Sequence, residues 1–397
     1  MERKLIVFTL LIIASVRGEI KSQEKSLPEC IDIALQNNLQ LRVAELDIQR
    51  AKTEQTTAFN PEKTSVTYEQ DPLTPDWIDK KLTVSQTMEF PTVYIYRKKM
   101  LAHETRLVEN AAQAFRNELV RDVSVAYYAI FQARQKMHLL QQQDSLYAGC
   151  LQTSASRLRV GETNSLEMMN VLSRRQENRL QLQEATVELE NAQLTLMQLL
   201  NTSSVIRPTK GESGKIPEVF PETTDSVAIR ENPSLAYYAQ QMNVLDMQTS
   251  VEKSKLLPDL FVAYTFGDMA HPGFQVGVSV PLFFGTQRAR IKSAEIQHTQ
   301  AGVKKRQAEQ ALQQAYHRQR VEYCTAKENL TYYETEGLAQ ADEMLKIASA
   351  TYQTGEIDYM EYVQHLQAVI DVRLRHIEAL SRYNKSVIQL KYLRGIN

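Results

Sequence analysis

The sequence predicts a mainly α-helical fold with transmembrane β-strands. The expected chain is a duplicated coiled-coil unit of long helices with two β-hairpins. Three chains together form a 12-stranded β-barrel that continues into an α-helical tunnel. Three features predict this fold: a single spacing at which the chain repeats itself, helical stretches of unusual length, and two pairs of segments that alternate apolar and polar residues.

The duplication is visible as two matches at the same spacing. The segment RVGETNSLEMMNVL (159–172) matches QTGEIDYMEYVQHL (353–366), which aligns Gly161 with Gly355, and ALQNNLQL (34–41) matches AIRENPSL (228–235) at the same distance. Self-similarity at a fixed spacing is typical of a repeated structural unit. We therefore divide the chain into a signal peptide (1–18), a first repeat (19–201), a linker (202–221) and a second repeat (222–397).

Each repeat has the pattern of a helix, a β-hairpin and two long helices. In the first repeat we expect a helix over 28–59, a hairpin within 62–90 with strands over 62–69 and 82–90, and helices over 93–159 and 164–200. In the second we expect a helix over 222–256, a hairpin within 259–283 with strands over 259–266 and 274–283, and helices over 286–353 and 358–393. Helix then exceeds about 60% of the chain, well above the usual third.

The long helices need lateral partners. Leu182, Leu189 and Leu196 recur every seven residues, and a seven-residue apolar period drives left-handed coiled-coil packing. Taken alone, this periodicity favours a plain coiled-coil spacer. The alternating segments argue against that interpretation.

Those segments favour a membrane barrel. Apolar side chains at Leu260, Val262, Tyr264 and Phe266 alternate with Phe261, Ala263 and Thr265, and a similar period of two runs through 82–90 and 274–280. Such alternation suits a half-buried sheet or a transmembrane barrel with a wet lumen. The hairpins stand between very long helices and have no globular core to cover. Four strands cannot close a barrel, and open strand edges are costly in lipid. Three chains give twelve strands, whereas two would give eight and a filled interior.

The composition excludes several other classes. Lys and Arg (46) balance Asp and Glu (47), so the net charge is −1 and no nucleic-acid partner is expected. The three cysteines show no CxxC or zinc spacing, and the seven histidines are scattered. We find no phosphate loop, nucleophile elbow or HExxH motif. The sequence therefore predicts neither an enzyme nor a cofactor or metal site.

The N-terminus indicates export. A basic head, Glu2-Arg3-Lys4, precedes an apolar run from Leu5 to Val16. This run is long enough for a signal peptide and too short to span a bilayer as a mature helix. Cys30 lies well beyond it, so it does not look like a lipid-attachment cysteine.

The chain resembles the TolC family of outer-membrane efflux and secretion channels. The resemblance rests on the repeated helix starts such as LQNNLQLRVAELDIQRAK (35–52), the strand exit VSVPLFFGTQRARI (278–291) and the paired glycine tips. It implies a homotrimer in the outer membrane of a Gram-negative bacterium, with a barrel in the lipid and a helical tunnel across the periplasm. The chain would be a passive exit duct, coupled through a periplasmic adaptor protein to an inner-membrane pump.

The exit of the first hairpin points to one branch of that family. The segment SQTMEFPTVYIYRKK (85–99) looks like the CusC- and CzcC-like heavy-metal branch. That branch serves resistance-nodulation-division (RND) pumps. The cargo expected from this resemblance is heavy-metal cations or drugs.

The resemblance also implies a gate at the periplasmic end. Tyr352 matches a tyrosine that latches the closed tip, and Glu361 matches an aspartate of the family's acidic constriction ring. Glu167 holds the same place in the first repeat, Gln364 replaces the second ring aspartate, and Asp358 adds a charge nearer the turn. A ring of carboxylates attracts cations. The alternatives are a packing aromatic for Tyr352 and ordinary solvated carboxylates for the acids.

The hairpin tips at Gly161 and Gly355 are the expected adaptor contacts. Glycine permits the positive φ that such a turn needs. Arg157 and Arg159 lie just before the first tip, where they either dock the adaptor or favour the helix C-terminus.

Two other functions remain open. A duct for type I protein secretion has the same fold and a different inner-membrane partner. A periplasmic coiled-coil scaffold would be soluble and would form no membrane trimer.

Overall fold

The computed structural model describes residues 23–74, 77–161, 164–209, 214–217, 229–267, 273–280 and 283–396. The expected signal peptide (1–18) and part of the expected linker lie outside these ranges. The chain is mostly helical, as predicted. It divides into two compact units. The hairpin unit comprises Met1–Leu39, Asn117–Asp225 and Ala315–Asn397, and the sheet unit comprises Gln40–Arg116 and Ser226–Gln314.

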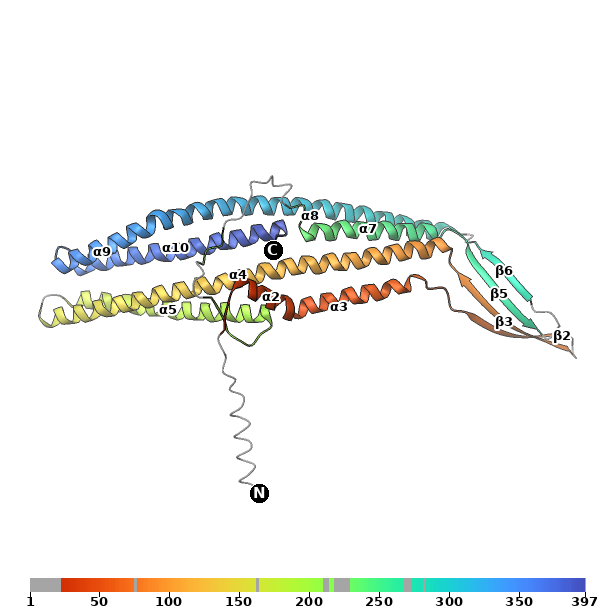
Figure 1. Ribbon diagram of the computed structural model, residues 1–397, viewed down its shortest axis with the longest axis horizontal. Helices are drawn as coiled ribbons and strands as arrows, with labels where there is room; N and C mark the ends of the chain where they lie inside the picture. The colour runs from red at the N-terminus through yellow and green to blue at the C-terminus, as the bar shows by residue number, and fades with distance from the viewer. Residues whose placement is uncertain are drawn as a thin grey trace, which may run out of the picture. The chain divides into compact units, whose positions relative to one another are not determined.

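The two halves of the sequence repeat one order of elements, and Figure 1 labels the long helices and the strands of the hairpins. The first half forms α2 (Leu27–Asn37), α3 (Leu39–Glu54), the 3₁₀ turn η1 (Gln55–Ala58), β2 (Ser65–Thr74), β3 (Trp77–Met88), α4 (Pro91–Arg159) and α5 (Ser165–Leu200). The second forms α7 (Pro233–Ser254), β5 (Asp259–Gly267), β6 (Gly273–Ser279), α8 (Gly285–Tyr332), the π-helical turn η2 (Tyr333–Gly337), α9 (Leu338–Thr354) and α10 (Tyr359–Arg394). The predicted duplicated unit is therefore present. Each compact unit draws on both halves.

The first helix is not continuous over 28–59 as predicted. Asn38 adopts an extended conformation (φ −66°, ψ 120°) between α2 and α3. Its Nδ2 donates to the Leu199 carbonyl over 3.3 Å, and Nδ2 of Asn201 donates to the Asn37 carbonyl over 3.3 Å. These two hydrogen bonds tie the break between α2 and α3 to the end of α5.

The second repeat also departs from the predicted bounds. Helix α7 begins at Pro233, and Asn232 caps it by accepting a hydrogen bond of 2.9 Å from the Ser234 amide. Proline at the first helical position and asparagine before it are typical of a helix start. The rest of the predicted start, 222–228, lies outside the described residues. Strand β6 ends at Ser279 and does not reach 283. Val280 precedes Pro281 in the sequence, and proline cannot donate to a strand ladder.

The predicted helix over 286–353 contains a π-helical turn, η2. Here Gly337 packs against an aromatic side chain, and a Cβ built on it would lie 3.0 Å from the Tyr333 ring. Apolar periodicity alone cannot reveal such a turn, because a π-helical turn widens the hydrogen-bonded backbone ring without breaking the helix. The α8–η2–α9 segment therefore forms three elements in place of one.

The hairpin unit has a core beneath α2. It also contains a short parallel pair that the sequence did not predict, β1 (Gln23–Lys25) with β4 (Ile206–Pro208). The hydroxyl of Tyr127 in α4 donates to the Lys25 carbonyl over 3.1 Å. Tyr127 belongs to a fully buried cluster from α2, α4, α5 and β4: Cys30, Ala34, Leu119, Val123, Ala126, Tyr127, Ile130, Leu196, Leu200 and Ile206. The N-terminal helix is thus fixed to the long helices of its own repeat.

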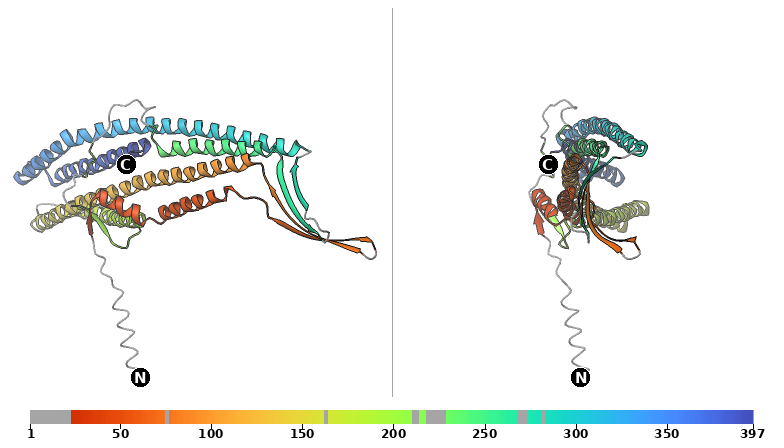
Figure 2. Two further views of the ribbon diagram at one scale, coloured as in Figure 1. Left: turned by 45° about the vertical axis from the view of Figure 1, so that its right-hand side comes forward. Right: turned by 90° about the vertical axis from the view of Figure 1, so that its right-hand side faces the viewer.

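The sheet unit contains a four-stranded antiparallel sheet among the described residues, in the order β2-β3-β5-β6. Each repeat supplies one hairpin, and β3 joins β5 to make the sheet continuous, as Figure 2 shows. Strands β2 and β6 are its edges. Both predicted hairpins are present. The strands expected at 62–69 and 82–90 are shifted, because β2 begins at Ser65 and β3 ends at Met88, while both extend further toward their shared turn.

Candidate functional site

Two glycines end the long helices of the hairpin unit. Gly161 (φ 78°) and Gly355 (φ 79°) both adopt the left-handed conformation. At the second tip the Glu356 amide donates to the Thr351 carbonyl over 2.9 Å, and the Gly355 amide donates to the Tyr352 carbonyl over 3.3 Å. These two bonds form a Schellman motif, which favours glycine at this position. The predicted helical hairpins therefore turn at the predicted residues.

The acids Asp358 and Glu361 cap helix α10. The Glu361 amide donates to Oδ1 of Asp358 over 2.8 Å, and the Asp358 amide donates to Oε2 of Glu361 over 3.3 Å. This reciprocal capping box satisfies two amides that have no partner inside the helix. The negative charges also lie at the positive end of the helix dipole. Both side chains are exposed, so each combines a local structural role with a charge facing solvent.

Glu167, the counterpart of Glu361, is placed differently. Asn164 caps α5 by accepting a hydrogen bond of 3.1 Å from the Glu167 amide. The Glu167 carboxylate turns back toward α4, where it accepts a hydrogen bond of 3.3 Å from the fully buried hydroxyl of Ser154. Glu167 is half-buried. The two repeats therefore do not present equivalent acids to solvent.

Tyr352 connects the two helical hairpins. Its ring stacks on Tyr362 with centroids 4.8 Å apart and planes at 15°, and meets Tyr359 edge-on at 6.0 Å. Its hydroxyl oxygen accepts a hydrogen bond of 3.4 Å from the Arg157 guanidinium in α4. Sequence reasoning named Tyr352 and Arg157 separately, and the structure brings them into contact.

An aromatic cluster lies beneath this contact. Tyr147, Val171, Tyr359, Val363, Leu366 and Ile370 form its buried core, with Cys150 and Tyr352 packed against it. The Tyr147 hydroxyl donates to Oε1 of Gln367 over 2.9 Å, which joins α4 to α10. Burial, reinforced by the neighbouring Cys150 thiol, raises the pKa of Tyr359. Burial likewise raises the pKa of Cys150. Both groups stay protonated at neutral pH, so the cluster remains uncharged.

Five of the predicted site residues line one open groove of about 740 Å³ at the second tip: Arg157, Tyr352, Gly355, Asp358 and Glu361. Glu356 also lines it and was missed by the sequence reasoning. Its position directly after the turn glycine is the signal that was available. Gly161, Glu167, Gln364 and Arg159 do not line this groove. Gln364 and Arg159 are exposed, and Nε of Arg159 donates to the Ala155 carbonyl of its own helix over 3.5 Å.

The four-stranded sheet has one exposed apolar face. The register places Leu82 opposite Phe266, Val84 opposite Tyr264, and Val262 opposite Val276. On the edge strand, Phe274, Val276 and Val278 are 67%, 69% and 64% exposed. The other face carries mainly small and polar residues, and the hydroxyl oxygens of Thr83 and Thr265 lie 3.2 Å apart on it. An exposed apolar face of this extent marks a surface that contacts lipid or protein.

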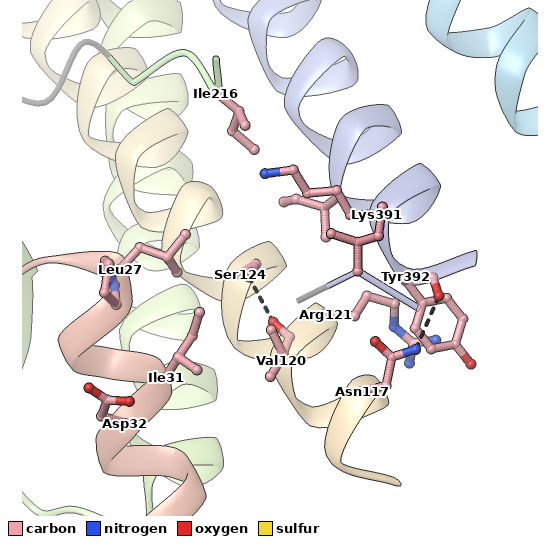
Figure 3. Close-up of a pocket in the computed structure, with 13 residues that line it drawn as sticks. Leu27, Ile31, Asp32, Asn117, Val120, Arg121, Ser124, Ile216, Lys391 and Tyr392 are labelled. Carbon is pink, nitrogen blue, oxygen red and sulfur yellow. Dashed lines mark hydrogen bonds between the residues drawn. The ribbon is translucent and has the colours of Figure 1, made fainter. Parts of the chain in front are cut away.

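A separate pocket of about 350 Å³ lies among α2, α4 and α10 in the hairpin unit (Figure 3). Its lining is mainly apolar, with Leu27, Ile31 and Val120 on two walls. Nδ2 of Asn117 donates to the Tyr392 carbonyl over 3.1 Å, and the Arg121 guanidinium lies 4.5 Å above the Tyr392 ring. These contacts hold the C-terminal end of α10 against α4.

Metal-ligating side chains do not gather in the part of the chain that the structure describes. No set of three His, Cys, Asp or Glu residues there is arranged to hold a metal ion. A search of the same residues for helices long and apolar enough to cross a membrane finds none.

Comparison with known proteins extends these observations. The family described as "Outer membrane efflux protein" matches residues 226–395. The chain is therefore similar to this family over that segment. The matched segment nearly coincides with the predicted second repeat. No curated protein matches the chain.

Solved structures share the fold over almost the whole chain. A membrane protein from Pseudomonas aeruginosa superposes with a TM-score of 0.83 at 18% identity, covering 94% of this chain and 90% of its own. CusC, which forms a transmembrane channel, gives a TM-score of 0.81 at 17% identity, covering 94% and 93%. The outer membrane protein VceC from Vibrio cholerae gives a TM-score of 0.78 at 13% identity, covering 94% of this chain and 96% of its own. The predicted fold of the chain, a duplicated unit of long helices with two β-hairpins, is therefore confirmed.

Proposed function

We propose that this chain is the outer-membrane exit duct of a tripartite efflux system. The observation that carries the proposal is the sheet, whose four strands align their apolar side chains on one exposed face in a fold shared with outer-membrane channels. Lipid suits that face, because burying exposed apolar side chains in hydrocarbon is favourable. The family match over 226–395 supports the same function.

A homotrimer completes the barrel. A sheet with two open edges leaves strand amides and carbonyls unsatisfied in lipid. Pairing β6 of one chain with β2 of the next satisfies these groups. Three copies then close a barrel of twelve strands, an even number that bacterial barrels use. The small and polar sheet face would line the lumen.

The groove at the second tip is the proposed gate. Three acids lie there, Glu356, Asp358 and Glu361, and their symmetry copies would form negative rings. Such rings favour cations by charge without binding them tightly. Glu361 suits the ring better than Glu167, because Glu361 is exposed and Glu167 is half-buried against Ser154. The tyrosine and arginine contact between the hairpins would hold the tip closed.

The transport energy would come from partners. The hairpin tips at Gly161 and Gly355 would dock a periplasmic adaptor, and an inner-membrane RND pump would drive heavy-metal cations or drugs into the duct. The likeness of 85–99 to the heavy-metal branch supports the cation cargo.

Single-channel recording tests this function. The purified chain, reconstituted in a planar bilayer, should give discrete conductance steps with a preference for cations. A preparation that inserts and conducts nothing, even when Y352F removes the contact that holds the tip closed, would overturn the duct. Conduction without a preference for cations would support the duct and contradict the acidic gate.

A further inference from the structure

The four strand ends that connect to helices all lie at the same end of the sheet. Strand β3 leads into α4 and β6 leads into α8, while β2 and β5 begin shortly after η1 and α7. Because neighbouring strands are antiparallel, these four strand ends lie side by side at one end of the sheet, as can be followed in Figure 1. The first turns of α4 and α8 therefore stand where the apolar sheet face ends.

Basic residues are concentrated in those first turns. We define the basic collar as Arg97, Lys98 and Lys99 of α4 with Arg288, Arg290 and Lys292 of α8. Five of the six are exposed, and Arg97 is half-buried. At 1.5 Å per residue, Lys98 lies about 10 Å and Arg290 about 8 Å from the start of its helix. The headgroup layer is about 5–8 Å thick on each side of the hydrocarbon core. Because long side chains on a helix lean toward its N-terminus, the charged ends of Lys98 and Arg290 reach back into this layer.

Part of the collar is not neutralised by protein. Arg97 pairs with Glu89 at 2.6 Å, and Lys292 lies 4.0 Å from Glu295. Arg290 acts electrostatically on the Glu252 carboxylate, and Lys99 lies 5.5 Å above the uncharged Tyr96 ring. Lys98 and Arg288 form no ion pair within the described residues, so their charge is available to an external anion.

Exposed apolar side chains accompany the collar. Phe283, just before α8, is 90% exposed, Phe59 is 63% exposed, and Ile95 in the first turn of α4 is 52% exposed. The Phe59 and Tyr94 rings lie 5.0 Å apart, and the Tyr94 hydroxyl accepts a hydrogen bond of 3.0 Å from the Glu89 amide. Aromatic side chains beside basic ones are typical of a membrane–water interface.

We propose that the basic collar binds the phosphate headgroups of anionic phospholipids, of the phosphatidylglycerol class, in the leaflet next to the helices. The proposal rests on the proposed function, because it requires the sheet to be inserted in a bilayer. The apolar face fixes the depth of the sheet, and this depth holds Lys98, Arg288 and Arg290 at the headgroups. Each basic residue near an anionic surface favours it by a factor of about five.

Lipid association measured with spin-labelled lipids tests the proposal. The full chain is reconstituted in phosphatidylcholine vesicles that carry traces of spin-labelled phosphatidylglycerol or spin-labelled phosphatidylcholine, and the immobilised fractions are compared. The wild type should prefer phosphatidylglycerol severalfold at low salt and lose most of that preference at high salt. R288Q/R290Q should lower the preference for phosphatidylglycerol at least twofold, and K98Q/K99Q should also lower it.

A matched control lies on the same helix. K304Q/R306Q removes two exposed charges with the same spacing, about 24 Å further along α8, and should leave the preference unchanged. An equal loss in this control, or a wild type without preference, would overturn the proposal. Co-purification of an acidic protein that depends on the collar, with no lipid preference, would assign the collar to a protein partner instead.

Conductance in the same vesicles separates the two proposals. A chain that conducts and shows no lipid preference removes the collar proposal alone. A chain that neither inserts nor conducts contradicts the duct and the collar together.

Discussion

Arg157 and Tyr352 join the two helical hairpins through a hydrogen bond of 3.4 Å from the guanidinium to the phenolic oxygen. The two residues come from different repeats, one near the end of α4 and the other near the end of α9. Tyr352 also stacks on Tyr362 of α10. Removing the hydroxyl therefore breaks this hydrogen bond between the hairpins and leaves the packing within the second hairpin in place.

We predict that Y352F and R157Q each raise the open probability of the reconstituted channel about 2- to 10-fold, the effect of losing one hydrogen bond of ~0.5–1.5 kcal/mol. The double variant should open no more than R157Q alone, because Y352F removes a hydrogen bond that R157Q already removes. Single-channel recording measures this, with R159Q as the control because Arg159 bonds within its own helix. Additive effects of Y352F and R157Q, or a raised open probability in R159Q, would contradict the proposal that the Arg157–Tyr352 contact holds the tip closed.

Glu361 has two roles that one substitution separates. In E361Q the amide oxygen still accepts the Asp358 amide while the charge is lost, so helix capping should change by only a few tenths of a kcal/mol. In E361A both are lost. We expect both variants to reduce the cation-to-anion permeability ratio about twofold, and E361A alone to lower the thermal midpoint. Reversal potentials measure the ratio.

Glu343, exposed and beside Lys346 on α9, supplies the control for this prediction. E343Q removes the same charge away from the groove and should leave the ratio unchanged. A wild-type ratio in E361Q would show that Glu361 only caps its helix.

The turn glycines should be sensitive to alanine. Gly355 has φ 79°, a conformation that costs an L-residue about 1–2 kcal/mol, so G355A should destabilise the tip by that amount. Gly149 lies inside α4, and nothing lies within 4 Å of a Cβ built there. G149A should therefore stabilise by about 0.5–1 kcal/mol. Thermal unfolding followed by circular dichroism compares them, and equal shifts of the same sign would contradict the left-handed turn.

Asp144 should make stability depend on acid pH. Hydrogen bonding to Arg175, with Arg179 in support, lowers the pKa of Asp144 from its usual 3.8. The folded pKa lies below the unfolded one, so this stabilisation is complete above the unfolded pKa and is lost as the pH falls through the folded pKa. R175Q should cost about 1 kcal/mol at neutral pH.

The difference between wild type and R175Q should shrink once the pH falls below 3.8. R174Q is the neighbouring control, since Arg174 makes an exposed pair with Glu177 at 3.3 Å, whereas the Asp144 carboxylate pairs with Arg175 and Arg179. Thermal midpoints measured at neutral pH and at a pH below 3.8 test the contribution of the Asp144–Arg175 pair. A constant difference between wild type and R175Q across this range would contradict the assignment.

The sequence predicted the order of elements because apolar periodicity is a direct consequence of burial. Alternation in 82–90 and 260–266 placed β3 and β5, and the repeat placed the turns at Gly161 and Gly355. The internal breaks were missed for a different reason. The bend at Asn38 depends on the Leu199 carbonyl, far away in the sequence, and the π-helical turn at Gly337 keeps the helical pattern intact.

The candidate site was predicted in part. The sequence identified Tyr352, Arg157, Asp358 and Glu361 by position, and the structure shows the contacts among them. The capping box could have been recognised, because an aspartate followed three residues later by a glutamate is a known helix-start pattern. The inward turn of Glu167 could not, since it depends on a buried serine of another helix.

The number of chains per particle tests the central claim most directly. The full chain is extracted in detergent from an outer-membrane fraction, and the mass of the native particle is measured. We predict three chains, because three four-stranded sheets close a barrel with no open edge. A monomer, or a protein recovered only from the soluble periplasm, would contradict the duct and leave the molecule a coiled-coil scaffold.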